Sequence, residues 1–358
     1  MPISSLAGDC LTATFVDIFS GAGGSALGFV RGGLELIGAL ERYMPAVKTF
    51  EGNLGVRPVV ADAWKFDFAA WGKELGDVDV VVGCPPCQGF SRLRRSYPKV
   101  SEDRRNGLVF VYLKAVKALK PKVAVFENVA WMTRGIGCIY LSGLVEGLRK
   151  LGYHVCYDIL DARDYGVPQR RKRLILVASS KSSPLLPLPT HGAPNSQAIQ
   201  EGLLRTWTTV RDAIADLPPL GPGEADPHIP NHVTKRLPEN WLQLIRAIPK
   251  DGGSRKDAPR ELWLPAHQRH EGHWDVFGRL AWDSQANTIT TGCWNPSKGR
   301  FVHPEQDRGL SLRECARLQG FPDNYVFYGK PSSVARQIGE ALPPPLAEAV
   351  ARTLIELF

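Results

Sequence analysis

Short apolar runs alternate with amphipathic stretches through the first half of the chain. The runs predict buried strands at residues 14–19, 36–40, 58–60, 78–82, 123–126, 153–160 and 173–178. Apolar residues at helical spacing follow several of them, at about 25–31, 106–119 and 139–151. Strands that alternate with helices in this way form mostly parallel sheets, so the pattern predicts an α/β fold.

The pattern changes near Ser179. Residues 179–305 show weak periodicity and many glycines and prolines, which predicts a smaller, irregular lobe. Regular spacing returns at Ser311, which with Glu314 forms a capping box for a helix at 312–318, and a last helix at about 345–358 carries an apolar stripe. We therefore expect a main domain at 1–178, a second lobe at 179–305 and a return segment at 306–358 that completes the main domain.

Composition and charge narrow the class of protein. With 358 residues, 44% of them hydrophobic, the chain can fill two cores. Its 44 Lys and Arg against 36 Asp and Glu give a formal net charge of +8, which favours a polyanionic partner. Seven cysteines without a repeated spacing do not form a disulfide framework. We expect a cytoplasmic protein with no membrane anchor, since no apolar run is long enough to span a bilayer.

The most informative stretch is GCPPCQGFS at 83–91, which follows the apolar run at 78–82. Open α/β sheets place their active sites at the carboxyl ends of strands, so Cys87 is the candidate nucleophile. Cys84 and Cys87 also form a CxxC pair, which in other proteins is a redox dithiol or half of a zinc site. Zinc requires four ligands and no second close pair is present, so we expect no metal.

A strand, glycine turn and helix open the chain. Gly21, Gly23 and Ala26 match the nucleotide-binding pattern GxGxxG/A directly after the strand at 14–19. Glu41, twenty residues beyond Gly21, is placed to accept hydrogen bonds from ribose hydroxyls, and Asp62 is a candidate partner for an adenine amino group. These residues alone fit NAD or S-adenosylmethionine.

Charged residues follow other strands. Glu127 comes at the carboxyl end of the strand at 123–126, and QRRKR occupies 169–173 between the last two strands. Between residues 92 and 105 lie six arginines and lysines, which beside a nucleophile predict a phosphate-binding loop.

The order of these blocks resembles that of the cytosine-5 DNA methyltransferases of the bacterial restriction-modification or Dcm-like type. The resemblance covers nearly the whole chain, and residues 179–305 lie where that family has its target recognition domain. It implies the Rossmann-like fold of S-adenosylmethionine-dependent methyltransferases. The blocks that carry it are DIFSGAGGSALGF (17–29), Glu41, Asp62, GCPPCQGFS (83–91), ENV (127–129), QRRKR (169–173), RECARLQGFP (313–322) and QIGEALPPPLA (337–347).

The resemblance also implies catalytic roles. Carbon 5 of cytosine is a poor nucleophile until a thiolate adds to carbon 6, and Cys87 is similar to the family's attacking cysteine. Glu127 would hold a proton against ring N3. Arg171 and Arg173 would hold the carbonyl oxygen of the base and support the Cys87 site electrostatically.

The implied cofactor is S-adenosylmethionine. Residues that match the family's cofactor site are Phe19, Gly21, Gly23, Gly24, Glu41, Asp62, Leu108 and Glu340. Glu340 departs from the family pattern, which usually has asparagine after this glycine.

The implied substrate is a cytosine turned out of double-stranded DNA. Residues expected to contact it or the neighbouring DNA are Gln88, Ser91, Arg92, Arg95, Gln169, Thr288 and Thr290. The resemblance further implies a monomer associated with the bacterial nucleoid, with a cognate restriction endonuclease as a candidate partner. Three alternatives stay open: a tRNA cytosine-5 methyltransferase, a catalytically silent DNA-binding homologue and a nicotinamide-dependent oxidoreductase.

Overall fold

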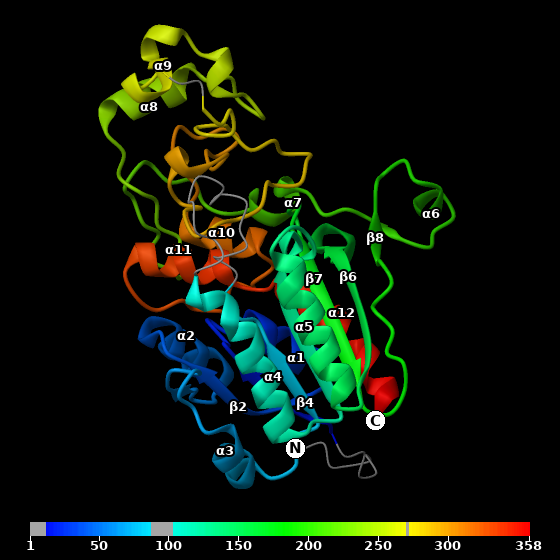
Figure 1. Cartoon of the computed structure of the whole chain (residues 1–358). Helices are drawn as coiled ribbons and strands as arrows, with labels where there is room; N and C mark the ends of the chain where they lie inside the picture. The colour runs from blue at the N-terminus through cyan, green and yellow to red at the C-terminus, as the bar shows by residue number, and fades with distance from the viewer. Residues whose placement is uncertain (1–11, 87–102, 270–271) are drawn as a thin grey trace, which may run out of the picture.

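The computed structural model describes residues 12–86, 103–269 and 272–358. The described chain forms two lobes, a larger one built around a sheet and a smaller one with little regular structure (Figure 1). No helix within the described ranges combines the length and apolar character required to cross a lipid bilayer.

The large lobe contains a seven-stranded sheet in the order β3-β2-β1-β4-β5-β7-β6. Neighbouring strands from β3 to β5 run parallel, whereas β7 is antiparallel to both β5 and β6. This confirms the predicted mostly parallel sheet. The exception has a simple cause, because the short link between β6 and β7 has no α-helix to carry the chain back across the sheet. The strands are β1 (Thr14–Ile18), β2 (Glu35–Glu41), β3 (Val59–Val60), β4 (Val80–Gly83), β5 (Val123–Val129), β6 (His154–Asp161) and β7 (Lys172–Ser179).

Helices cover both faces of the sheet (Figure 1). On β4, Val81 packs with one layer of helices, while Val80 and Val82 pack with the other, as the alternation of side chains along a strand requires. One layer consists of α3 (Phe68–Leu75), α4 (Leu108–Leu119) and α5 (Gly137–Lys150). The other consists of α1 (Gly24–Arg31), α2 (Met44–Leu54) and α12 (Pro344–Leu354).

The last helix returns to the sheet, as predicted. Helix α12 packs directly on α1, where the backbones approach so closely that a Cβ on Gly28 would lie 2.4 Å from the Cβ of Ala347. The carboxyl-terminal residues thereby complete the layer that covers β1.

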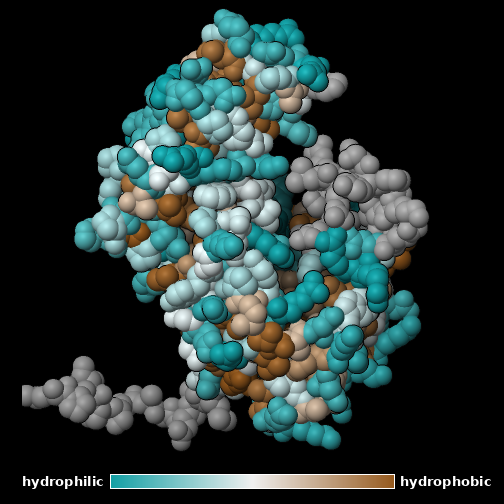
Figure 2. All heavy atoms as spheres, turned by 90° about the vertical axis from the view of Figure 1, so that its left-hand side faces the viewer, coloured by the Kyte–Doolittle hydropathy of each residue, from teal (hydrophilic) through white to brown (hydrophobic). Residues whose placement is uncertain are grey.

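The small lobe is held together by two apolar clusters and has only short regular elements. Helices α10 and α11 belong to the first of these clusters, which also contains Ala22 from the turn between β1 and α1. Figure 2 shows hydrophilic side chains over most of the face of this lobe, with scattered hydrophobic patches. Its elements are α7 (Val210–Ile214), α8 (Glu239–Ala247), α9 (Pro265–Arg269), α10 (Leu312–Leu318) and α11 (Pro331–Glu340). The short elements β8 (His191–Gly192), α6 (Gln197–Gln200) and β9 (Arg205–Thr206) lie apart from it, and β8 contacts the residues that follow β6 (Figure 1).

Buried charge anchors α10 in this lobe. Ser311 and Glu314 form the predicted capping box. The Glu314 carboxylate also pairs with the fully buried Arg308, at 2.6 Å and 2.8 Å. Because a buried charge without a partner is costly, this pair fixes how the helix enters the lobe.

The strand order creates a crevice in the sheet. From β1 the chain builds outward through β2 and β3, and it then returns to add β4 and β5 on the other side of β1. The carboxyl ends of β1 and β4 therefore lie side by side with their loops diverging, which is where open α/β sheets bind ligands.

Candidate active site

A pocket of about 1160 Å³ opens at this crevice. Its walls come from the carboxyl ends of the central strands, from residues 288–291 of the small lobe and from the end of α11. Sites for one small molecule span roughly 300–1,000 Å³. The pocket therefore lies just above the upper end of the range for one small-molecule ligand.

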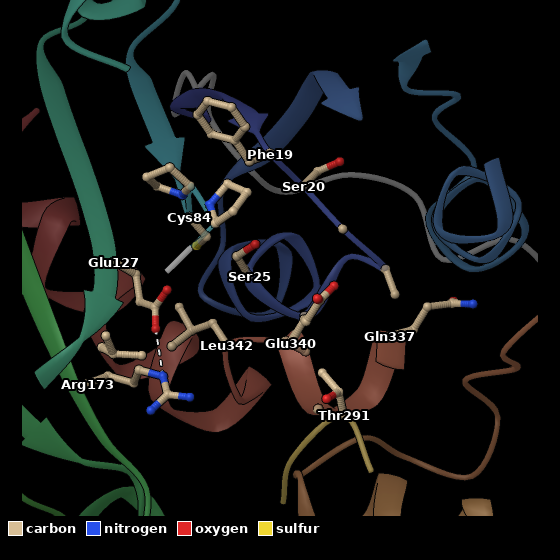
Figure 3. Close-up of a pocket in the computed structure, with 18 of the residues that line it drawn as sticks. Phe19, Ser20, Ser25, Cys84, Glu127, Arg173, Thr291, Gln337, Glu340 and Leu342 are labelled. Atoms are coloured by element: carbon tan, nitrogen blue, oxygen red, sulfur yellow. Dashed lines mark ion pairs between the residues drawn. The ribbon is translucent and has the colours of Figure 1, made fainter. Parts of the chain in front are cut away.

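Glu127 lies at one corner of the pocket, near the end of β5. Its carboxylate pairs with Arg173 at 2.8 Å, across the antiparallel pairing of β5 with β7 (Figure 3). Burial raises the pKa of Glu127, although Arg173 and Arg171 act to lower it. The side chain therefore keeps its proton to higher pH than an ordinary glutamate does.

Arg171 is 1% exposed and joins three parts of the chain. Its guanidinium donates to the main-chain carbonyls of Ile289, Gly339 and Ala341, at 2.8–2.9 Å. The same side chain lines the pocket and lowers the pKa of Glu127. Its hydrogen bonds thus place residues 289 and 339–341 against the corner of the pocket that holds Glu127.

The glycine turn after β1 forms the opposite wall. Phe19 adopts a φ of 61°, which is uncommon for a residue with a side chain, and lines the pocket. Gly21 has a φ of 53° and open space where a Cβ would lie, so a ligand can approach its backbone. The Gly21 N–H donates to Glu41 at 3.0 Å.

Gly23 differs from the prediction, because it does not line the pocket. With a φ of 85° it faces inward, where a Cβ would lie 2.6 Å from the Tyr325 hydroxyl. Gly24 does line the pocket, and a Cβ there would meet the Leu342 carbonyl at 2.4 Å. The second glycine of the motif therefore shapes the turn instead of facing the ligand.

The remaining predicted cofactor residues surround the same cavity. Asp62 and Leu108 line it beyond the glycine turn. Glu340 lines it from the end of α11, where its carboxylate points into the pocket and pairs with Arg336 at 3.1 Å (Figure 3). The guanidinium of Arg336 in turn stacks over the Tyr43 ring at 4.6 Å.

The predicted substrate residues divide into three groups. Thr288 and Thr290 line the pocket from the small lobe. Gln169 instead is fully buried, donates to the Leu318 carbonyl and the Gln319 side chain, and accepts from the Ile289 N–H, so it braces the loop from inside. The others lie outside the described residues, as does the predicted nucleophile: Cys87, Gln88, Ser91, Arg92 and Arg95. The described chain reaches the pocket wall at Pro86, one residue before Cys87.

Several pocket residues were not predicted. Asp161 ends β6 and obeys the same strand-end rule that identified Glu127, so that rule was a usable signal. Trp131 and Arg134, which stack at 5.5 Å, follow the ENV block closely. Ser25 and Cys84 also line the pocket, and no pattern in the sequence marks either as facing a ligand.

The donor set of the glycine turn fits a cationic ligand better than a diphosphate. In dinucleotide-binding folds, such a turn offers free N–H groups to a pyrophosphate. Here the Gly21 N–H is bonded to Glu41, and the Glu340 carboxylate faces the same cavity. Two carboxylates disfavour a diphosphate and favour a positively charged group such as a sulfonium or an ammonium.

Comparisons with known proteins agree with this geometry. A type II methylase of Herpetosiphon aurantiacus, M.HgiDII, is 31% identical, with 96% of this chain and 95% of the relative aligned. A type II methyltransferase of Haemophilus parahaemolyticus, M1.HphI, is 32% identical over 97% of this chain and 88% of the relative. The solved structure of the Entamoeba histolytica methyltransferase EhMeth matches with a TM-score of 0.63 over 97% of this chain and 99% of that one, and at 14% identity it shows the fold alone. The family model for C-5 cytosine-specific DNA methylases matches residues 13–356, and this chain therefore belongs to that family.

Proposed function

We propose that this chain transfers a methyl group from S-adenosylmethionine to carbon 5 of a cytosine that has been turned out of duplex DNA. The observation that carries the proposal is the buried Glu127–Arg173 pair, which shares one pocket with the glycine turn and with the end of β4. A proton-holding acid, a cofactor cradle and the segment that bears the predicted nucleophile thus meet in a single cavity.

The cofactor would occupy the side of the pocket formed by the glycine turn. Glu41 and Asp62 offer acceptors to ribose and adenine, and Phe19 and Leu108 supply apolar contacts. Glu340 would face the positively charged end. Once bound, S-adenosylmethionine supplies an electrophilic methyl group.

The protein's own groups prepare the cytosine. Cys87, which follows the pocket wall, would form a bond from its sulfur to carbon 6 of the ring. Glu127 would hold a proton against N3 as negative charge develops, and its raised pKa keeps that proton available. Arg173, which orients the Glu127 carboxyl, would also face the carbonyl oxygen of the base. Carbon 5, made electron-rich by the addition at carbon 6, would then take the methyl group from the sulfonium, and loss of the carbon 5 proton to water would restore the ring double bond and expel the Cys87 thiolate.

The two lobes would hold the DNA between them. Thr288 and Thr290 place the small lobe at the rim of the pocket, next to Arg170 and Lys172, whose side chains are exposed, and the Thr288 hydroxyl donates to the Arg170 carbonyl at 2.7 Å. Removing a base from the stack costs a few kcal/mol, which contacts of this kind to the DNA backbone offset. We propose that the enzyme acts as a cytoplasmic monomer on chromosomal DNA, alongside a cognate restriction endonuclease.

Transfer of labelled methyl groups tests the proposal. The protein is incubated with labelled S-adenosylmethionine and either duplex DNA or tRNA, and the product nucleosides are identified by mass spectrometry. We expect 5-methyldeoxycytidine from the wild type and none from Cys87→Ser. Glu127→Gln should lower the rate of methyl transfer at least about 100-fold, which is the usual contribution of one general acid. Label in tRNA alone would assign the chain to RNA, and label in neither would refute the activity.

A further inference from the structure

Three pocket-lining side chains of the large lobe, Ser25, Cys84 and Glu127, form a row that continues into the core at Asp17. Asp17 lies within β1 and is fully buried, and it accepts a hydrogen bond of 2.5 Å from the Ser25 hydroxyl at the start of α1. The thiol of Cys84, just after β4, interacts with both Ser25 and the Glu127 carboxyl of β5. Figure 3 shows the Cys84 sulfur between these two side chains.

Burying the row of polar side chains formed by Asp17, Ser25 and Cys84 lowers the stability of the folded protein. A buried acid without full compensation destabilises a fold, and the second carboxyl oxygen of Asp17 has no hydrogen-bond partner within the described ranges. The neighbouring positions in β1 and β4 are apolar and fully buried. Packing alone gives no reason for Asp17, Ser25 and Cys84 in a row, so a role at the pocket is the better explanation.

The state of the Cys84 thiol indicates what it does. Burial and the nearby carboxylates of Glu127 and Asp17 raise the pKa of this thiol well above its ordinary value. It is therefore protonated at neutral pH, which makes it a hydrogen-bond donor and a poor nucleophile. The protonated thiol lies between Ser25 and Glu127, so it donates to the Glu127 carboxyl while Ser25 contacts it from the other side.

We propose that Cys84 is a positioning residue for Glu127, with its thiol, supported by Ser25 and Asp17, holding the carboxyl on the side away from Arg173. A carboxyl group fixed only by Arg173 at 2.8 Å could still rotate, whereas a second contact defines both of its oxygens. The acidic proton then points into the pocket, toward the place where the ring of the base would bind. This inference rests on the proposed methyl transfer.

The test compares two substitutions of Cys84 in the full-length protein. Cys84→Ser keeps a donor of similar size, and Cys84→Ala removes it. We expect Cys84→Ala to lower kcat about 10- to 100-fold with little change in the KM for S-adenosylmethionine, because the acid loses its alignment. Cys84→Ser should restore kcat to within about threefold of the wild type. Cys156→Ala, which removes a free thiol on β6 outside the pocket, is the matched control.

A second measurement follows Glu127 itself. The groups that face its carboxyl are Cys84, just after β4, Arg173 in β7 and Arg171, just before β7. Because the thiol stabilises the carboxylate form, its removal should move the Glu127 titration, read by carbon-13 NMR and assigned with Glu127→Gln, to higher pH. The alkaline limb of the kcat profile should move in the same direction.

The outcomes separate this inference from the proposed function. An unchanged titration and kcat in Cys84→Ala would overturn it, and so would a Cys84→Ser variant as slow as Cys84→Ala at equal Tm. A wild type that methylates no DNA would refute the activity, while the titration would still decide whether Cys84 acts on Glu127. If Cys84→Ala does not fold, Ser25→Ala is tested in its place. We expect this variant to lose less kcat, because Cys84 is still present as the donor to Glu127.

Discussion

At the scale of single residues, Glu340 is where this chain departs from its family. It pairs with Arg336 on the same helix while its carboxylate faces the cofactor side of the pocket. Exposed pairs of this spacing contribute only about 0.3–0.5 kcal/mol, so the pair is not required for folding. We expect Glu340→Asn, the usual family residue, to retain or improve methyl transfer.

The control for this substitution is Glu348→Asn, which removes an equivalent pair with Arg352 on α12, outside the pocket. Steady-state rates with S-adenosylmethionine as the varied substrate compare the two variants. A large loss of activity in Glu340→Asn but not in Glu348→Asn would show that the carboxylate is required here.

Asp17 makes stability depend on pH. Burial raises its pKa from 3.8 to about 7. Between these values the unfolded chain has lost the proton and the folded protein has kept it, so stability falls as pH rises through this window and is constant above it. At about 1.4 kcal/mol for each pKa unit, the loss between pH 5 and pH 8 is roughly 3 kcal/mol.

Asp17→Asn removes this ionisation and isolates its effect. Urea unfolding at pH 5 and pH 8 should show the wild type losing roughly 3 kcal/mol relative to the variant over that interval. Parallel changes in the two proteins would mean that Asp17 ionises normally in the folded state.

At the scale of elements, the contact between α1 and α12 depends on Gly28. A Cβ there would lie 2.5 Å from the Pro344 carbonyl and 2.7 Å from the Glu348 nitrogen, and backbone atoms cannot move aside as a flexible side chain can. We expect Gly28→Ala to destabilise the protein by about 1–3 kcal/mol or more, through overpacking, and to lower the Tm.

Gly72→Ala is the matched control, since it adds the same methyl group to helix α3. There the nearest atom is the end of the Leu119 side chain, at 3.0 Å. Alanine is the better helix former by about 1 kcal/mol, so this variant should be neutral or slightly more stable. Equal losses in both variants would show that the α1–α12 contact is not special.

Elements with strong periodicity could be predicted from the sequence. The seven strands of the large sheet and helices α1, α4, α5, α10 and α12 follow from apolar runs and capping signals. Helices α2 and α3 were missed because each buries only a few side chains, and α6 to α9 and α11 were missed because no sustained apolar spacing marks them.

The candidate site divides in the same way. Strand-end positions such as Glu127 and Glu41 were predictable, because the strand fixes where their side chains emerge. Gly23 and Gln169 match family blocks but turn inward, since a motif gives residue types without the direction that each one faces. Cys84 gained its partners only when β1, β4 and β5 came together, which no local pattern records.

At the scale of the whole molecule, the net charge of +8 explains DNA binding only if the positive side chains lie where the DNA would bind. Arg170 and Lys172 are exposed at the rim of the pocket, where Arg170 also donates to Asn287 of the small lobe at 2.9 Å. Cations in this position would contact phosphates on both sides of the extruded nucleotide. A contact of that kind contributes to affinity for any sequence and releases counterions.

Salt dependence distinguishes such local contacts from overall charge. Log Kd for duplex DNA is measured against log salt concentration for Lys172→Ala, Arg170→Ala and Arg352→Ala, which change the net charge equally. Arg352 lies on α12, outside the pocket. Each rim variant should lower the slope by about 0.9, the value for one lost phosphate contact, and weaken all sequences alike. An equal change of slope in Arg352→Ala would mean that DNA binding depends on the total charge of the protein, and that Arg170 and Lys172 make no specific phosphate contacts at the pocket.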